Sequence, residues 1–323
     1  MVFDNNNNID TAFAHDSIDN ALDQRQLNKI VASGAISFLF GAGVNGAAFE
    51  NFRGGFLQTK TALRDKGQPG EEIEAELSNL EDSQYDEVLN TLVEEFNRIS
   101  INIDMNHSAI ANLQSLLDIV FKIVNTTENR QLCTKKVSIF TLNYDQIVEN
   151  ILDRRGYFYH SVAAKKPQPQ ESSDVIGYNT VTRVYVPTFA VLKLHGTANQ
   201  NGKINKDSII LPGGDKLRGI LSNEFFEPLF LMKTELLKPN AVLFVIGYSG
   251  ADIHVNDVLR DATNRGLTVI WLQYSDNEWG SNSEAVSPKV FVVRPVSINE
   301  GFQDTTKTLY DLLFHAAGIE SEV

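Results

Sequence analysis

The chain has 323 residues, 42% of them hydrophobic, which is enough for one large domain or two modest ones. With 28 basic and 41 acidic residues its net charge is -13, so it gains no general attraction for nucleic-acid phosphates. Its single cysteine, Cys133, excludes an intrachain disulfide framework and any zinc module built from several cysteines. We therefore expect a globular protein that makes no direct contact with nucleic acid.

The N-terminal part of the chain predicts one helix and one strand. Residues 16–33 carry apolar side chains at helical spacing and end before Gly34. Residues 35–40, "AISFLF", form a short apolar run between glycines, which is typical of a buried strand in a parallel sheet. The start of the chain is polar and acidic, and no apolar run approaches the roughly 18 residues that span a membrane. We therefore expect a cytoplasmic protein without membrane contact.

Residues 56–130 differ in character from what precedes them, because they are acidic and carry apolar side chains at helical spacing. One apolar face falls on Val88, Leu89, Leu92, Val93, Phe96 and Ile99, and a second on Ile110, Leu113, Leu117, Val120, Phe121 and Val124. No strand is predicted here. The pattern indicates a helical insertion or subdomain at 56–130, within an α/β domain made of residues 1–55 and 131–323.

Strands alternate with helices in the rest of the chain. Strands are predicted at 136–141, 183–194, 241–246, 267–272 and 289–294, and helices near 145–154, 222–236, 252–264 and 303–317. This alternation predicts a Rossmann-like, doubly wound α/β fold with a mostly parallel sheet.

Three glycines, Gly41, Gly43 and Gly46, follow the first strand with the G-x-G-x-x-G spacing of dinucleotide-binding loops. Small residues there let a pyrophosphate approach the backbone amides at a helix N-terminus. A dehydrogenase also needs a second strand that ends in an acidic residue about 20 positions later. The chain has "FLQTKTALRDKG" in that region, which is not a strand. An ordinary Rossmann dehydrogenase is therefore disfavoured, and the glycines alone fit a structural turn equally well.

Polar groups follow three further predicted strands, in "FTLNYD" (140–145), "LKLHG" (192–196) and "VIGYSGAD" (245–252). Ligands of doubly wound sheets bind outside the carboxyl ends of the strands, where these residues can converge. Each also has a structural explanation. Asn143 and Asp145 can cap the next helix, His195 can sit beside a turn, and Gly247 and Ser249 can serve the backbone alone.

Taken together, the motifs resemble the sirtuin family, in particular its divergent bacterial NAD-hydrolase branch. The family pattern runs G-A-G-[IV]-S, D-F-R-G, T-x-N-x-D, H-G and G-[TY]-S. This chain has, in the same order, "GAGV" at 41–44, "NFRG" at 51–54, "TLNYD" at 141–145, "LHG" at 194–196 and "GYS" at 247–249. Because the motifs spread over most of the chain, the set is more specific than the glycines alone.

The chain departs from the family in ways that bear on its chemistry. Asn45 stands where the family usually has serine, and Phe52 and Arg53 follow the glycines unusually closely. Deacylases of the family usually carry a four-cysteine zinc module, which one cysteine cannot build. The resemblance therefore implies that the insertion at 56–130 replaces this module, that no zinc is bound, and that NAD itself is the substrate.

The resemblance implies a role for each of three catalytic residues. Asn143 is expected at a ribose hydroxyl or the attacking water, since an amide both donates and accepts. Asp145 is expected at the nicotinamide carboxamide or the developing cation. His195 is expected as general base, because an unperturbed pKa of about 6.5 suits that role.

The remaining site residues are expected to hold the dinucleotide. Gly41, Ala42, Gly43 and Val44 are expected at the pyrophosphate, Phe52 over the sugar, Arg53 at the loop or phosphate, and Gly247, Ser249 and Asp252 on the adenosine side, with Tyr274 a weaker adenine candidate.

These residues favour an NAD glycohydrolase that releases nicotinamide and ADP-ribose, which the resemblance associates with prokaryotic anti-phage defence. A non-catalytic NAD or ADP-ribose sensor, a zinc-free deacylase or ADP-ribosyltransferase, and an NAD-dependent oxidoreductase remain as alternatives. The resemblance further implies a homo-oligomer and a second defence component, such as a translocase-type ATPase or a short Argonaute. We expect residues 56–130 to cap the NAD crevice and to contribute to an interface.

Overall fold

The computed structural model describes residues 27–28, 35–49, 55–126, 136–162, 178–179, 184–185, 188–199, 201–210, 226–273, 290–293 and 305–317. The predicted helix at 16–33 lies outside these residues except at 27–28, which are helical. Phe52, Arg53 and Tyr274 also lie outside the described residues.

The centre of the protein is a seven-stranded sheet in which every neighbouring pair of strands is parallel. Its strands are β3 (Phe158–Val162), β6 (Thr188–Lys193), β2 (Lys136–Thr141), β1 (Ala35–Phe40), β7 (Ala241–Ile246), β8 (Thr268–Leu272) and β9 (Phe291–Val293), in that spatial order. The predicted Rossmann-like α/β fold is confirmed.

One strand prediction needs adjustment, and one strand was not predicted. The strand expected at 183–194 is divided into β5 (Val184–Tyr185), which pairs antiparallel with β4 (Tyr178–Asn179), and the sheet strand β6. No strand is predicted at β3, which lies at the edge of the sheet with only its last residue buried. An edge strand lacks the continuous apolar run on which the other predictions depended.

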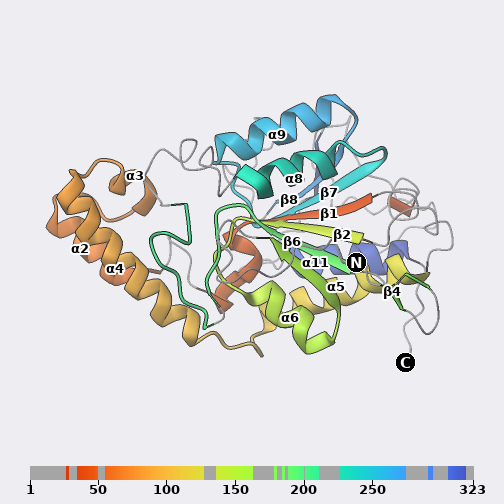
Figure 1. Cartoon of the computed structure of the whole chain (residues 1–323), viewed down its shortest axis with the longest axis horizontal. Coiled ribbons are helices and arrows are strands. Elements are labelled where there is room, and N and C mark those ends of the chain that lie inside the picture. The colour runs from red at the N-terminus through yellow and green to blue at the C-terminus, as the bar shows by residue number, and fades with distance from the viewer. Residues whose placement is uncertain are drawn as a thin grey trace, which may run out of the picture.

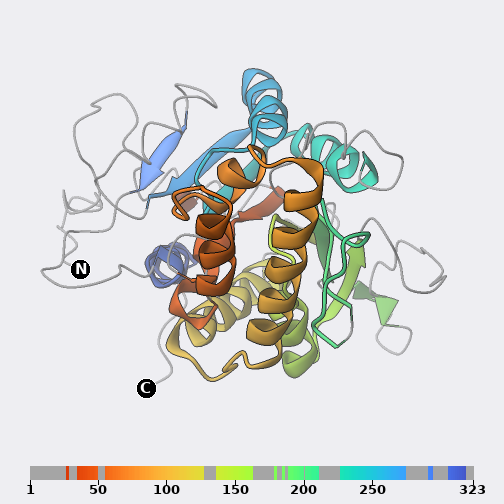
Figure 2. The ribbon, with the colours of Figure 1, turned by 90° about the vertical axis from the view of Figure 1, so that its left-hand side faces the viewer.

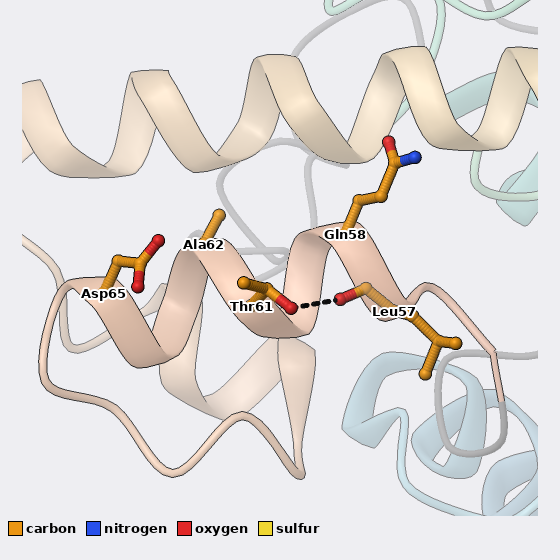
Figure 3. Close-up of a pocket in the computed structure, with 5 residues that line it drawn as sticks. All are labelled: Leu57, Gln58, Thr61, Ala62 and Asp65. Atoms are coloured by element: carbon orange, nitrogen blue, oxygen red, sulfur yellow. Dashed lines mark hydrogen bonds between the residues drawn. The ribbon is translucent and has the colours of Figure 1, made fainter.

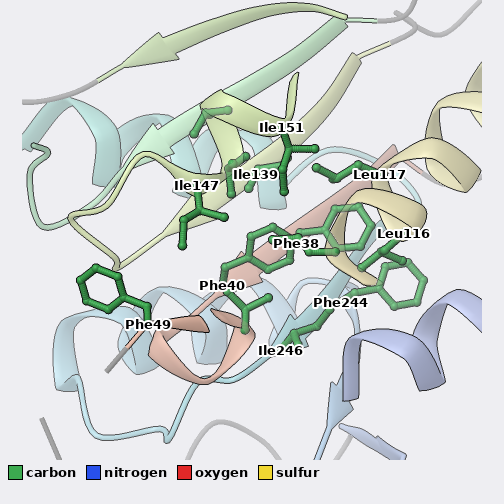
Figure 4. Close-up of a cluster of buried hydrophobic side chains, with 14 of the residues drawn as sticks. Phe38, Phe40, Phe49, Leu116, Leu117, Ile139, Ile147, Ile151, Phe244 and Ile246 are labelled. Atoms are coloured by element: carbon green, nitrogen blue, oxygen red, sulfur yellow. The ribbon is translucent and has the colours of Figure 1, made fainter. Parts of the chain in front are cut away.

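Helices cover both faces of the sheet, as Figure 1 shows. Helices α5 (Ser108–Thr126), α6 (Ile147–Arg155) and α11 (Thr305–Ala316) cover one face, and α8 (Phe226–Leu236) and α9 (Ile253–Asn264) cover the other. Side chains of β1 alternate between the faces, so Phe38 and Phe40 belong to the first core, drawn in Figure 4, and Leu39 belongs to the second. Burial on both faces explains why the central strands are mostly apolar.

The segment after the first strand is helical, as predicted. Its helices α2 (Leu57–Asp65), α3 (Ile73–Leu77) and α4 (Asp82–Ile101) project from one end of the sheet, and α5 then runs along the sheet's face (Figure 1). Viewed from that end, α2 and α4 lie side by side (Figure 2). We call α2, α3 and α4 the helical lobe. Its buried side chains, such as Leu92, belong to the same apolar cluster as Phe38, so lobe and sheet share one core. The division into domains remains a prediction.

Glu95 of α4 fixes the start of α2. Its carboxylate accepts hydrogen bonds from the backbone N–H of Gln58 (3.0 Å) and Thr59 (2.8 Å), and from the Thr59 hydroxyl (2.7 Å). A carboxylate at this place satisfies amides that have no partner within their own helix and complements the helix dipole. The lobe is therefore held together by a buried polar contact as well as by apolar packing.

Within the part of the chain that is described, no helix is both long and apolar enough to cross a membrane.

Candidate functional site

The order of the strands places a topological switch point between β1 and β7. After β1 the chain next enters the sheet at β2, on one side of β1, whereas after β7 it continues to β8, on the opposite side. In doubly wound sheets the loops that diverge here leave a crevice outside the carboxyl ends of the strands, and ligands bind in it. The glycine motif follows β1, and the "GYS" motif follows β7.

The glycines of these two loops allow the backbones to meet. Gly41 N donates to Ile246 O and Gly43 N to Gly247 O, both at 3.0 Å. A Cβ atom on Gly41 would lie 2.4 Å from Gly247 O, and one on Gly247 would lie 2.2 Å from Val44 N. Gly247 also has a φ of +66°, which favours glycine. The structural explanation that the sequence left open therefore holds at these positions.

A 3-10 helix, η2 (Ala42–Ala48), follows Gly41. Ala42 and Gly43 are exposed at its start, which leaves their backbone accessible to a ligand. The amide of Val44, one of those expected at a pyrophosphate, donates to Gly41 O within the turn (3.1 Å). The loop thus has an accessible edge, but this amide is already engaged.

The end of β2 is bonded to the glycine loop. Asn143 Nδ2 donates to Gly41 O (3.2 Å), and Asn45 Nδ2 donates to Asp145 Oδ2 (2.8 Å). The other carboxylate oxygen of Asp145 accepts from the Ile147 amide at the start of α6 (3.0 Å), so the capping role is also observed. In the sequence, Asn45 stands out only as a departure from the family pattern, and no local signal indicates its contact with Asp145.

Lys193, the last residue of β6, supports this arrangement from below the surface. Its side chain is 1% exposed, donates to the backbone oxygen of Asp145, and pairs with the Glu149 carboxylate at 3.3 Å. A buried charge requires such a partner, because transfer of an unpaired ion out of water is very costly. This pair is not among the predicted site residues, although a lysine at the end of an apolar strand is a signal for it in the sequence.

His195 lies in a cluster with two other side chains that can ligate metals or carry protons. Its Nε2 is 2.9 Å from His254 Nε2 and 3.9 Å from Asp252 Oδ1. His195 is buried, and the other two side chains are half-buried. Asp252 was expected on the adenosine side, yet it neighbours the residue expected to act as base. His254 was not singled out, although it follows Asp252 by two positions.

The loop that carries Gly247, Ser249 and Asp252 is held from beneath by Tyr248. The Tyr248 hydroxyl accepts from Asp252 N (3.2 Å) and lies 2.9 Å from Asn256 Oδ1, and Asn256 Nδ2 donates to Gly250 O (2.7 Å). Burial raises the pKa of the Tyr248 hydroxyl far above its ordinary value, so this group remains a neutral hydrogen-bonding partner. Ser249 is half-buried within this ordered loop.

The helical lobe packs against the loops at the carboxyl ends of the strands. Phe96 of α4 lies edge-on to Tyr144, with ring centroids 5.9 Å apart. Asn97 accepts from Ile204 N (2.7 Å) and donates to Ile204 O (3.1 Å), in the loop that follows His195. The lobe therefore contacts the loop that carries Asn143 and the loop that follows His195, and whether it caps the site remains a prediction.

A hollow on the surface of the lobe lies apart from these residues. It is lined by Leu57, Gln58, Thr61, Ala62 and Asp65, all on α2 (Figure 3). It contains none of the predicted site residues and brings only one charged side chain, so we do not assign it as the functional site.

The switch point and the loops around it define a Rossmann-like α/β protein, a fold in which ligands are expected outside the carboxyl ends of strands such as β1 and β7. Residues 137–287 match the family model described as a SIR2-like domain. This part of the chain is therefore similar to a SIR2-like domain, in agreement with the family that its motifs resemble.

Solved structures agree with this assignment at the level of the fold. A Sir2 homologue in complex with NAD superposes with a TM-score of 0.50 at 13% identity, over 95% of this chain and 98% of the other. A mutant Sir2 homologue in complex with ADP-ribose gives a TM-score of 0.50 at 12% identity, over 92% and 97% of the two chains. No curated protein gives a significant match.

Proposed function

We propose that this protein is an NAD glycohydrolase, which cleaves NAD with water to nicotinamide and ADP-ribose. The observation that carries the proposal is the convergence of four motifs at one switch point. Asn143 contacts Gly41, Gly43 contacts Gly247, and Asp252 neighbours His195. NAD and ADP-ribose are the ligands named for the Sir2 homologues of the same fold, which supports a dinucleotide in this crevice.

The reaction needs few groups, because nicotinamide is a good leaving group. The bond between the nicotinamide nitrogen and the ribose breaks, and its electrons neutralise the nicotinamide ring. Water adds to the sugar carbon and loses a proton, which the His195–His254 pair takes up. The Asp145 carboxylate, whose two oxygens accept from Asn45 and Ile147, contributes negative charge near the developing cation.

A second candidate is a sensor that binds NAD or ADP-ribose without cleaving it. It is favoured by the hydrogen bonds of Asn143 to Gly41 and of Asp145 to Asn45, which give both residues a structural role independent of catalysis. A zinc-free deacylase is a weaker candidate, because the site then needs a groove for an acyl-lysine peptide, and the lobe packs over the same loops.

The cellular setting follows from the same proposal. An enzyme that depletes NAD harms its own cell unless it is controlled, so we propose a role in anti-phage defence, in the cytoplasm, under the control of a partner. The partner is a second copy of the chain or a separate component, such as a translocase-type ATPase or a short Argonaute. The helical lobe is the proposed interface, since it contacts the loops of the crevice.

One assay separates the candidates. Purified protein is incubated with NAD, with and without an acetyl-lysine peptide, and nicotinamide, ADP-ribose and deacetylated peptide are followed by chromatography. An NAD glycohydrolase releases nicotinamide and ADP-ribose without peptide. Binding of NAD by calorimetry without product indicates the sensor, and product formation only with peptide indicates the deacylase.

A further inference from the structure

We propose that His195, Asp252 and His254 form a binding site for one divalent transition metal ion, with Zn²⁺ as the best match. Each of the three side chains offers one ligand atom, and these atoms all lie within 4.8 Å of one another. Two imidazoles and one carboxylate form the three-ligand set of open zinc sites, in which water takes the fourth position. Imidazole nitrogen selects Zn²⁺, Ni²⁺ or Cu²⁺ over Mg²⁺, which prefers oxygen.

The distances require only a small adjustment. Ligand atoms of a tetrahedral zinc site lie roughly 3.3 Å apart, since the bonds to zinc are about 2.0–2.2 Å long. The two Nε2 atoms are 2.9 Å apart and must separate slightly, while Asp252 Oδ1, at 3.9 Å from His195 Nε2, must approach. Both changes are within reach of side-chain rotation, because His254 and Asp252 are half-buried rather than packed in the core.

The backbone on both sides of the site is fixed, which preorganises the ligands. His195 O accepts from Ile210 N (2.8 Å), and Asp252 N donates to the buried Tyr248 hydroxyl (3.2 Å). Asp252 is the N-cap residue of α9, yet its carboxylate makes no capping hydrogen bond to that helix. Its carboxylate instead lies toward His195. The positive end of the α9 dipole would repel a bound cation, and the negative charge of Asp252 reduces this repulsion.

Metal binding and the observed contact between the histidines exclude each other. In the hydrogen bond, one Nε2 carries the hydrogen and the other supplies the lone pair. In the metal site, both Nε2 atoms supply lone pairs and both hydrogens sit on Nδ1. The sequence predicts that no zinc is bound, because one cysteine cannot build the family's module. The site proposed here departs from that prediction, since its ligands are two histidines and a carboxylate.

The direct test is titration of the chelator-treated full-length protein with Zn²⁺ by calorimetry, with Mg²⁺ as the ion that should not bind. We expect one Zn²⁺ per chain. Loss of a residue that only hydrogen-bonds to a metal ligand lowers metal affinity by roughly 10–100-fold. The variants His254→Ala and Asp252→Ala each remove a ligand, so they should weaken Zn²⁺ binding by more than this. The matched control is His315→Ala, which removes an exposed histidine on α11. Zinc affinity that is equal in wild type and His254→Ala overturns the site.

A spectroscopic measurement distinguishes loss of the metal site from loss of the fold. Co²⁺ in a tetrahedral site with nitrogen and oxygen ligands absorbs visible light, so wild-type protein and His315→Ala should gain such bands and His254→Ala should not. Circular dichroism of each variant shows whether it is folded. A folded His254→Ala that gains the same bands refutes the proposal.

A consequence of this site for NAD turnover rests on the proposed function. His195 bound to zinc through Nε2 has no lone pair there for a proton, so Zn²⁺ should suppress hydrolysis and a chelator should restore it. Zinc that binds at the site without slowing hydrolysis overturns this coupling. Chelator-treated wild type without any turnover instead refutes the proposed function, and the calorimetric result for the metal site stands by itself.

Discussion

Asn45 Nδ2 donates a 2.8 Å hydrogen bond to Asp145 Oδ2, and both side chains are almost fully buried. The bond joins the loop after β1 to the end of β2, two segments far apart in the sequence. Asn45 occupies the position at which the family usually has serine. A longer amide at this position lets the loop reach the carboxylate directly.

Replacement of Asn45 should therefore affect both stability and the site. Asn45→Ala leaves a buried carboxylate oxygen without its donor, and we expect a loss of about 1–3 kcal/mol in the free energy of unfolding. Asn45→Asp places two carboxylates in contact and should cost more. Chemical denaturation measures both, and NAD turnover should fall in parallel. The control Asn150→Ala removes an exposed amide on α6 and should leave both quantities unchanged.

Asn143 and His195 are expected to carry the chemistry. Asn143→Ala and His195→Ala should each lower NAD hydrolysis by roughly 100-fold or more, the scale of a lost acid–base or electrostatic group. Product release at saturating NAD measures this, with denaturation curves to verify folding and His315→Ala as the histidine control. Wild-type turnover in either variant contradicts the role given to that residue.

Gly247 combines a positive φ with a close contact, and the chain offers a control that separates the two effects. Gly156 has the same φ of +66°, but a Cβ atom there meets nothing within 4 Å. Gly156→Ala should cost about 1–2 kcal/mol, the price of a left-handed conformation for alanine. Gly247→Ala should cost clearly more, because its Cβ collides with the backbone of Val44. Equal losses in thermal or chemical denaturation contradict the close approach of the two loops.

Glu76 makes part of the stability dependent on pH. Burial raises the pKa of its carboxyl, but the backbone N–H groups of Glu72, Glu71 and Gly70 outweigh burial, and the pKa lies below its ordinary value. A lowered folded-state pKa adds stability that is present above the unfolded value, about 4.3, and is lost as the pH falls through the folded value.

Glu76→Gln should therefore lower the free energy of unfolding by about 1.5–3 kcal/mol at pH 7, since hydrogen bonds to a charged group are lost. The difference from wild type should shrink as the pH falls below about 4.3. Denaturation across this range measures it, with Glu94→Gln on the exposed face of α4 as control. A difference that stays constant down to low pH contradicts the assignment.

The helical lobe carries exposed apolar side chains that fit the proposed interface. Leu57 is 67% exposed and Ile101 is 58% exposed. Leu57→Glu and Ile101→Glu should reduce the mass of the protein in solution and change NAD turnover on the same samples. Phe158→Glu, at an equally exposed position on β3, should change neither. If the lobe variants keep mass and turnover, its helices only complete the core.

The elements of the sheet could be predicted because their chemistry is local. Strand β7 is apolar along its whole length, β1 is apolar at every position except Ser37, and the helices between them have clear apolar faces. β3 was missed because its residues are only partly buried at the edge. Sequence pattern reports burial, so it predicts the centre of a sheet better than its margin.

The site was predicted only in part, for a related reason. Motif spacing indicated that Asn143, His195 and the glycines belong together. It did not indicate that Asn45 bonds Asp145, that Lys193 supports Asp145, or that His254 adjoins His195. These contacts join distant segments and follow from the packing of loops, for which no local pattern exists.

The hydrogen bond between Gly43 and Gly247 also bears on how the protein is made. β1 and the glycine loop leave the ribosome early, but their partner β7 begins only at Ala241. A nascent chain that ends before β7 carries the glycine loop, Asn143 and His195 but lacks one wall of the crevice. Contacts between such distant segments form slowly and late. On the proposed function, we expect unfinished or C-terminally truncated chains to be inactive, so that synthesis itself would not expose the cell to the reaction.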